Sequence, residues 1–145
     1  FRESFRPFAP AVLEDESHKW FKMDYKSPFM LFVADLQDDK KIKLDEKKNK
    51  NLNELRSEIS SVTHVDYSAR VQTVNETNGK FYRLIKNFYK KTGCPIVINT
   101  SFNINREPIV GTIEEAYKTF LSSGLDILVC ENSILYKENQ YEKFN

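Results

Sequence analysis

The chain has 145 residues, a hydrophobic share of 40% and a formal net charge of +1. This length and apolar content suit one folded domain with a core and argue against intrinsic disorder. The balanced charge excludes a general attraction to nucleic acid or to membrane surfaces, so any anion site must be local. No apolar run reaches the roughly 20 residues that span a bilayer.

The two cysteines, Cys94 and Cys130, fit no metal-binding spacing. Each lies beside a predicted strand, so we expect buried free thiols in a reducing cytoplasm. The sequence shows no signal peptide. It begins with Phe1 inside what looks like structured sequence, and we therefore expect a fragment of a longer protein.

The first third of the chain predicts a strand, a helix and a second strand. Ala9 to Leu13 can form an edge strand, because prolines do not suit a central one. Residues 14–23 form an amphipathic pattern that places Trp20 and Phe21 toward the core. The apolar run 29–34 then predicts a buried strand.

Residues 35–56 differ in composition, with lysine, aspartate, glutamate and asparagine predominating. This pattern indicates a solvated polar insertion. A nucleic-acid patch is the alternative, but acidic residues are interleaved with the lysines and no aromatic residues are present for base stacking. We therefore expect no nucleic-acid partner.

Residues 59–74 alternate in a way that predicts two strands with a turn near Asp66 to Ser68. We expect His64 to be a hydrogen-bonded histidine within a sheet. The other histidine, His18, lies far away in the sequence, so a metal site built from a histidine pair is rejected.

The second half predicts two helices and a hairpin. A helix over 80–91 would turn Phe81, Leu84, Ile85 and Phe88 to the core. Thr112 and Glu115 form a capping-box pattern before a helix over 113–122. A buried strand at 127–130 pairs with 134–136. The alternation of strands and helices along the chain predicts an α/β fold with an open, mixed sheet.

One segment combines a buried strand with a polar loop. It runs from Pro95 to Asn103, and its β-branched residues give way to Asn, Thr and Ser. In open α/β sheets ligands bind at the carboxyl ends of strands. We therefore expect Asn99 to Asn103 to form part of a small-molecule or nucleotide pocket, with a plain capping turn as the alternative.

The chain has four glycines and neither of the common glycine-rich phosphate motifs. A nucleotide site would need arginines with hydroxyl and amide groups, because a guanidinium binds phosphate in a planar, bidentate way. The candidates are Arg6, Arg70, Arg106, Thr100, Ser101 and Asn103. Arg6 lies among phenylalanines and could instead stack on one at the surface.

Two carboxylates are candidates for a magnesium ion beside such a nucleotide. Asp66 and Glu107 could bind Mg²⁺ through water, as carboxylates do near nucleotides. They could equally be salt-bridge partners for Arg70 and Arg106.

Five segments, in order, carry a family resemblance. They are FRPFAPAVL (5–13), SPFMLF (27–32), VTHVDYSARVQTV (62–74), GCPIVINTSFNINREPIV (93–110) and FLSSGLDILV (120–129). Together they resemble the C-terminal domain of the O-carbamoyltransferases that act in nodulation and antibiotic tailoring. Only the insertion at 35–56 and the tail look unlike that family.

The resemblance implies that residues 1–145 form one YrdC-like domain, a twisted, mostly open mixed sheet flanked by helices. It implies that this domain joins carbamoyl phosphate to ATP, giving carbamoyl adenylate and pyrophosphate. An N-terminal Kae1-like domain, absent from this chain, would bind iron and pass the carbamoyl group to a hydroxyl acceptor.

The resemblance also places residues in the ATP and carbamoyl-phosphate pocket: Arg6, Arg70, Asn99, Ser101 and Asn103. We take Arg70 and Ser101 as catalytic candidates and add Thr100 and Arg106 as substrate-binding ones, with no metal ligand in this chain. YrdC-like sites use a strand lysine near the phosphates. Residues 29–34 have none, and the flanking Lys22 and Lys26 leave that role unassigned.

Two alternatives differ in class from the enzyme. One is a YrdC-like module that holds ATP or RNA without chemistry. The other is a structural domain whose polar loop only caps a helix. The acceptor substrate and the oligomeric state are not specified by the sequence.

Overall fold

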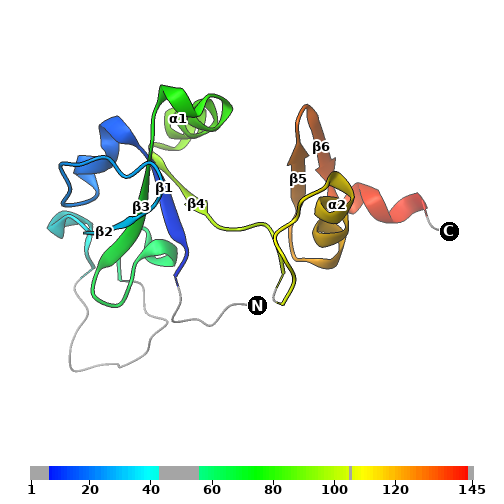
Figure 1. The fold of residues 1–145 in the computed structure, drawn as a ribbon, viewed down its shortest axis with the longest axis horizontal. Helices are drawn as coiled ribbons and strands as arrows, with labels where there is room; N and C mark the ends of the chain where they lie inside the picture. Colours follow the sequence, from blue (N-terminus) through cyan, green and yellow to red (C-terminus); the bar gives the residue numbers. More distant parts are fainter. Residues whose placement is uncertain (1–6, 43–55, 105, 144–145) are drawn as a thin grey trace. The chain divides into compact units, whose positions relative to one another are not determined.

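The computed structural model describes residues 7–42, 56–104 and 106–143 (Figure 1). Contacts along the chain divide it into two compact units. We call residues 3–100 the sheet unit and residues 101–145 the hairpin unit. That residues 1–145 form one domain with an insertion at 35–56 stays a prediction, and much of that insertion, 43–55, lies outside the described residues.

The sheet unit is built on four strands in the order β2-β3-β1-β4 (Figure 1). They are β1 (Ala9–Leu13), β2 (Phe32–Asp35), β3 (Ser68–Val74) and β4 (Ile96–Asn99). β1 pairs parallel with β3 and antiparallel with β4, and β2 pairs antiparallel with β3. The predicted open, mixed sheet of an α/β fold is confirmed.

β1 is a central strand, so the predicted edge position is wrong. All five of its residues are buried between β3 and β4. Its proline, Pro10, precedes Ala11, the first residue registered with β3. A missing N–H is tolerated at the start of a strand, where the ladder on that side has not begun.

Each face of this sheet has its own buried cluster. On one face, Val12, Phe21, Leu36 and Val71 belong to a cluster that Trp20 and Ile59 flank. Figure 1 shows α1 (Lys80–Thr92) beside the other face. There Ile85 packs with Ala11, Leu13 and Val74, which the 2.0-residue alternation of strands places together.

α1 confirms the predicted helix and ends at Gly93, whose φ of 75° gives a left-handed cap. Two of its four predicted core residues are nevertheless exposed, Leu84 by 60% and Phe88 by 40%. Helical spacing identifies an apolar stripe. It does not identify how much of that stripe another element covers.

The predicted buried strand at 29–34 is wrong in both extent and burial. β2 begins only at Phe32, after Met30 with a positive φ of 57°. Phe29 is 79% exposed and Leu31 is 74% exposed. Because β2 is an edge strand beside β3 alone, its apolar composition does not place it in the core.

Two other segments differ from their predictions. The predicted helix at 14–23 is a shorter 3-10 helix, η1 (Glu14–Lys19), after which Phe21 is buried as expected. In 59–74 the structure has a 3-10 turn, η3 (Ser60–Val62), and one strand, β3, in place of two. Further 3-10 turns are η2 (Asp38–Lys40) and η4 (Glu76–Asn78).

The hairpin unit contains α2 (Ile113–Ser122), β5 (Ile127–Cys130), β6 (Ser133–Tyr136) and the 3-10 segment η5 (Lys137–Lys143). β5 and β6 pair antiparallel, and Thr112 with Glu115 forms the predicted capping box. Leu128 and Phe120 are buried. Strand β5 is only half-buried, because Ile127 and Val129 are exposed.

Candidate active site

The end of the sheet face that α1 leaves uncovered holds Arg70 and Gln72. Arg70, Gln72 and Val74 are spaced two residues apart along β3, so their side chains share one face. Val74, at the other end of that face, is buried against α1. Gln72 is half-buried and Arg70 is exposed. Val33, registered opposite Arg70 on β2 and therefore on the same face, is 54% exposed. The sheet thus presents a cation on an open surface.

An amide pair lies beside this cation. Asn99, the last residue of β4, donates from Nδ2 to Oε1 of Gln72 at 2.6 Å. Gln72 in turn donates from Nε2 to the carbonyl of Pro28 at 3.1 Å. These bonds hold both amides in fixed orientations across the sheet. Gln72 was not predicted as a site residue. Its position two residues after Arg70 in a predicted strand places it on the same face as Arg70 and could have indicated it.

The guanidinium of Arg70 has no ion pair and no hydrogen bond within residues 7–42 and 56–100. Asp66, one of its predicted partners, instead accepts hydrogen bonds from Ser68 Oγ at 2.6 Å and from Ser68 N at 3.0 Å. These bonds, the side-chain one first, lower the pKa of Asp66. The charge of Arg70 therefore stays available to an anionic ligand.

His64 does not lie in a strand, contrary to prediction. It precedes β3 in a tight turn in which its N–H donates to the carbonyl of Ser68 at 2.7 Å. Tyr67 N–H donates back to the carbonyl of His64 at 3.0 Å, and Tyr67 has a left-handed φ of 64°. The ring is hydrogen-bonded as expected, with Nδ1 2.8 Å from Ser68 Oγ.

The polar loop of the hairpin unit is closed by hydrogen bonds between its own residues. Ser101 Oγ donates to Asn103 Oδ1 at 2.6 Å, and Asn103 Nδ2 donates to the carbonyls of Ile104 and Glu107 at 3.2 and 3.0 Å. The N–H of Val110 donates to the carbonyl of Phe102 at 3.0 Å. In this structure Ser101 and Asn103 therefore stabilise a turn within their own loop, while the N-cap of α2 is Thr112.

The remaining candidates are placed as follows. Thr100 is exposed and ends the sheet unit. Arg106 is exposed with a left-handed φ of 71° in the loop of the hairpin unit. Arg6 lies outside the described residues. Arg70 and Asn99 thus belong to the sheet unit, and Ser101, Asn103 and Arg106 belong to the hairpin unit.

The two lysines considered for the phosphates are both ion-paired. Lys22 Nζ lies 2.8 Å from a carboxylate oxygen of Asp38, and Lys26 Nζ lies 2.7 Å from one of Glu14. Either lysine would have to leave a carboxylate in order to bind a phosphate.

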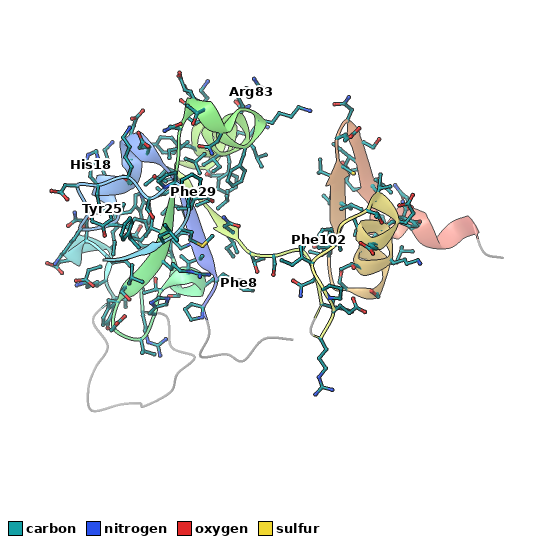
Figure 2. The ribbon with its side chains drawn as sticks, in the orientation of Figure 1. Phe8, His18, Tyr25, Phe29, Arg83 and Phe102 are labelled. Carbon is teal, nitrogen blue, oxygen red and sulfur yellow. The ribbon has the colours of Figure 1, made fainter. Side chains whose placement is uncertain are left out.

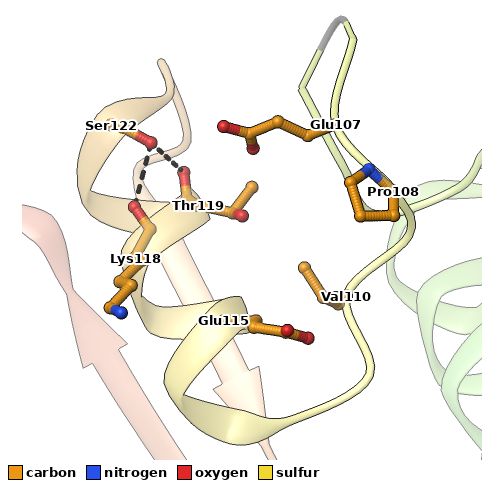
Figure 3. A pocket seen from close by; sticks show the side chains of 7 residues that line it. All are labelled: Glu107, Pro108, Val110, Glu115, Lys118, Thr119 and Ser122. Carbon is orange, nitrogen blue, oxygen red and sulfur yellow. Dashed lines mark hydrogen bonds between the residues drawn. The ribbon is translucent and has the colours of Figure 1, made fainter.

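A cavity of about 330 Å³ lies within the hairpin unit (Figure 3). Loop residues Glu107, Pro108 and Val110 face α2 across it, and Lys118, Thr119 and Ser122 are on the α2 side. Its second carboxylate, Glu115, accepts from the N–H groups of Gly111 and Thr112 and so belongs to the cap.

A second cavity, of about 270 Å³, lies in the sheet unit. Three carboxylates line it, those of Glu14, Asp15 and Glu76, so it does not suit a triphosphate. Among the described residues, no candidate for binding ATP or carbamoyl phosphate lines either of these two cavities, whereas Glu107, considered for Mg²⁺, lines the first.

The described ranges contain neither a cluster of metal ligands nor a membrane-spanning helix. Across 7–42, 56–104 and 106–143, no three histidine, cysteine or acidic side chains come together in a way that could hold a metal ion. Cys94 and Cys130 are half-buried free thiols. No helix in those ranges has the length and apolar content to cross a bilayer.

Comparison with known proteins identifies relatives. The chain is 44% identical to an uncharacterized protein of Synechocystis sp. over 99% of its own length and 24% of that protein's length. It is 39% identical to nodulation protein NolNO of Sinorhizobium fredii over 94% of the chain and 18% of the relative. It is 30% identical to a 3'-hydroxymethylcephem-O-carbamoyltransferase of Amycolatopsis lactamdurans over 88% of the chain and 22% of the relative.

The chain therefore spans about a quarter or less of the length of these relatives. A family model described as "Carbamoyltransferase C-terminus" matches residues 1–137, which is nearly the whole chain. The segments that carry Arg70, Asn99 and the polar loop all lie inside this match. The chain belongs to the carbamoyltransferase C-terminus family.

Proposed function

We propose that this chain is the domain of an ATP-dependent O-carbamoyltransferase that makes carbamoyl adenylate. Its substrates are ATP and carbamoyl phosphate, and an N-terminal Kae1-like, iron-binding domain of the parent protein transfers the carbamoyl group to a hydroxyl. Membership of the carbamoyltransferase family supports the class of reaction. The YrdC-like character of the fold and a cytoplasmic location are parts of the same proposal.

The observation that carries the proposal is the guanidinium of Arg70, which has no ion pair within residues 7–42 and 56–100, beside the fixed Gln72–Asn99 amide pair. Adenylate formation gathers negative charge around phosphorus. A guanidinium stabilises this charge through bidentate hydrogen bonds, and amide groups orient the carbonyl and phosphate oxygens. An open, cationic end of a sheet suits anionic substrates better than the carboxylate-lined cavity of the same unit does.

The proposed reaction balances with one water. Water cleaves carbamoyl phosphate to carbamate and inorganic phosphate. A carbamate oxygen then attacks the α-phosphorus of ATP, and pyrophosphate leaves with the electron pair of the broken P–O bond. Arg70 stabilises the charge on the α-phosphate of the adenylyl group being transferred, and Mg²⁺ would neutralise part of the triphosphate charge when bound. Arg6, Thr100, Ser101, Asn103 and Arg106 are proposed as further substrate contacts.

The test is ATP–pyrophosphate exchange that depends on carbamoyl phosphate, measured in the full-length protein that carries this chain. Arg70→Ala should lower the exchange rate by about 10²–10³-fold, as loss of one preorganised donor does. The matched control is Arg83→Ala, an exposed arginine on α1 (Figure 2). Equal exchange rates in the two variants would contradict the role of Arg70.

One observation favours a non-catalytic nucleotide-binding module as second candidate. The Ser101 hydroxyl, proposed as catalytic, donates its proton within its own loop. Calorimetric binding of ATP by the full-length protein, with no exchange at saturating carbamoyl phosphate, would support the module and contradict the enzyme.

A further inference from the structure

The turn before β3 contains a linear hydrogen-bond network of three side chains. Ser68 Oγ lies 2.6 Å from Asp66 Oδ1 and 2.8 Å from His64 Nδ1. Ser68 is buried, and its backbone N–H also donates to Asp66 Oδ1 at 3.0 Å. The serine therefore lies between the carboxylate and the imidazole, unlike a hydrolase triad, in which the histidine is central.

This order fixes which atoms carry protons. A serine hydroxyl has one proton to donate. The Asp66 carboxylate is ionised, since its hydrogen bonds lower its pKa, and it can only accept. The Ser68 proton is therefore directed to Asp66, and Ser68 Oγ can only accept from the ring of His64. It follows that Nδ1 of His64 carries a proton and that, in the neutral ring, Nε2 carries the lone pair.

Nε2 of His64 is open to a ligand. Within residues 7–42 and 56–100 it has no hydrogen-bond partner. His64 is half-buried, and among the described residues no buried side-chain nitrogen or oxygen lacks a partner, so those residues do not bury Nε2. The backbone bonds of the turn hold the main chain at His64, and the contact of Nδ1 with Ser68 Oγ orients the ring.

The network lies at the Arg70 end of the sheet. Ser68 and Arg70 are two residues apart on β3, so they share a face, and α1 covers the opposite end of that face. The open end thus offers a guanidinium for phosphate and, beside it, a ring nitrogen that can only accept a hydrogen bond.

We propose that His64 is held as its Nδ1–H tautomer by the Asp66–Ser68 pair so that Nε2 accepts a hydrogen bond from the carbamoyl NH₂ of the substrate. The ligand named here rests on the proposed function. Carbamoyl phosphate pairs an anionic phosphate with an NH₂ donor, which matches the two groups at the sheet end. Acetyl phosphate carries a methyl group in place of the NH₂ and cannot donate to Nε2, so His64 acts as a specificity residue.

The tautomer is tested directly by ¹⁵N NMR of the histidine rings at a pH where they are neutral. We expect His64 to show a protonated Nδ1 and an unprotonated Nε2, and Ser68→Ala to abolish this preference. His18, the other histidine, is exposed and serves as the internal reference. A protonated Nε2 at His64 would overturn the proposal.

The recognition role is tested with His64→Asn in the full-length protein. The asparagine amide overlays Nδ1 and can still donate to Ser68, but it lacks any atom at the position of Nε2. We expect kcat/KM for carbamoyl phosphate to fall about 10–100-fold, the effect of one lost hydrogen bond, with ATP affinity unchanged. The ratio of carbamoyl to acetyl phosphate use should fall by the same factor, while His18→Asn leaves both unchanged.

An unchanged substrate ratio in His64→Asn would overturn the recognition role. Absence of any carbamoyl-phosphate-dependent exchange in the wild type would instead overturn the proposed function, and with it the ligand named for Nε2. The NMR result is independent of that outcome, so the two failures are distinguishable.

Discussion

The sheet unit and the hairpin unit differ in how many faces they bury. In the sheet unit, clusters around Phe21 and Ile85 cover opposite faces of four strands. In the hairpin unit, α2 contacts β5, and the buried Phe120 and Leu128 mark its covered face. Residues 127, 129, 134 and 136 are exposed on the face that antiparallel register assigns to them together.

The unit that buries two sheet faces is expected to be more rigid than the unit that buries one. A single two-stranded hairpin is marginal in water, whereas three or more strands packed against a helix can be stable. Arg70 and the Gln72–Asn99 amide pair therefore belong to the unit with the larger core, which can hold their geometry. The loop with Ser101 and Arg106 belongs to the unit with the smaller core.

The largest effect is expected from removing the core of the sheet unit. Phe21→Ala removes a fully buried ring from the cluster around Val12 and Val71. It should lower the free energy of unfolding by about 3–5 kcal/mol, measured by urea denaturation. Phe29→Ala is the control, because that ring is exposed and its loss should cost under about 0.5 kcal/mol.

The variant Phe21→Ala also tests whether the two units unfold independently. If each unit is held by its own core, hydrogen exchange in Phe21→Ala should accelerate in β1 and β3 more than in α2. Equal acceleration of all three would show that the two units unfold together.

An intermediate effect is expected from the caps, one in each unit. The Thr112 hydroxyl accepts from the N–H of Glu115 at 3.2 Å, and Thr112→Ala should destabilise the protein by about 1 kcal/mol. Faster amide exchange in the first turn of α2 would report the loss. In the sheet unit Asn75 accepts from the N–H of Thr77 at 3.0 Å, so Asn75→Ala is the counterpart. If each variant speeds amide exchange only in its own unit, the two units are independent. If either variant speeds exchange in both units, they are coupled.

The smallest expected effect is a loss of stability at low pH that depends on Asp38. Hydrogen bonds from Lys22, first, and Lys41 lower the pKa of Asp38 from 3.8 to about 2. A carboxyl whose folded pKa is depressed contributes stability above its ordinary pKa, and this contribution is lost as the pH falls through the folded value. Wild type should therefore lose a small advantage over Asp38→Asn between pH 3.8 and about 2.

The measurement is the urea midpoint of both proteins across that pH range. Because Asp38 is exposed, 1 M salt should shrink the difference. A gap that does not change with pH would contradict the assignment of this carboxyl.

Local signals in the sequence predicted helices and turns well. The capping box at Thr112, the helix over 80–91 and the pairing of 127–130 with 134–136 each depend on residues close in sequence, and each was confirmed. Burial was predicted less well, since it depends on which element covers a strand. Phe29 and Leu84 are large apolar residues of the kind found in cores. Within the described ranges, however, no neighbouring element covers them, and both are exposed.

The candidate site shows the same limit. From the sequence, charge predicted Arg70 as a site residue and position at the end of a strand predicted Asn99, and the structure places both on one face of the sheet unit. The prediction from sequence missed Gln72, whose role comes from the register of β3 and β4 on either side of β1. It also missed the network of His64, because tautomer and proton direction follow from interatomic distances rather than from residue types.

The central position of β1 has a consequence for the time course of folding. Its partners arrive late in the sequence: Ala11 is registered with Gln72, 61 positions later (72 − 11), and with Val97, 86 positions later (97 − 11). During synthesis β1 emerges before both of its partner strands, and its pairing with β4 must wait for residues 96–99. Such non-local pairing slows the search for the native topology, so we expect refolding in milliseconds to seconds rather than microseconds. Because loop-closure entropy grows only by about 0.6 kcal/mol per doubling of length, the connection through 35–56 can change in length at little cost to stability.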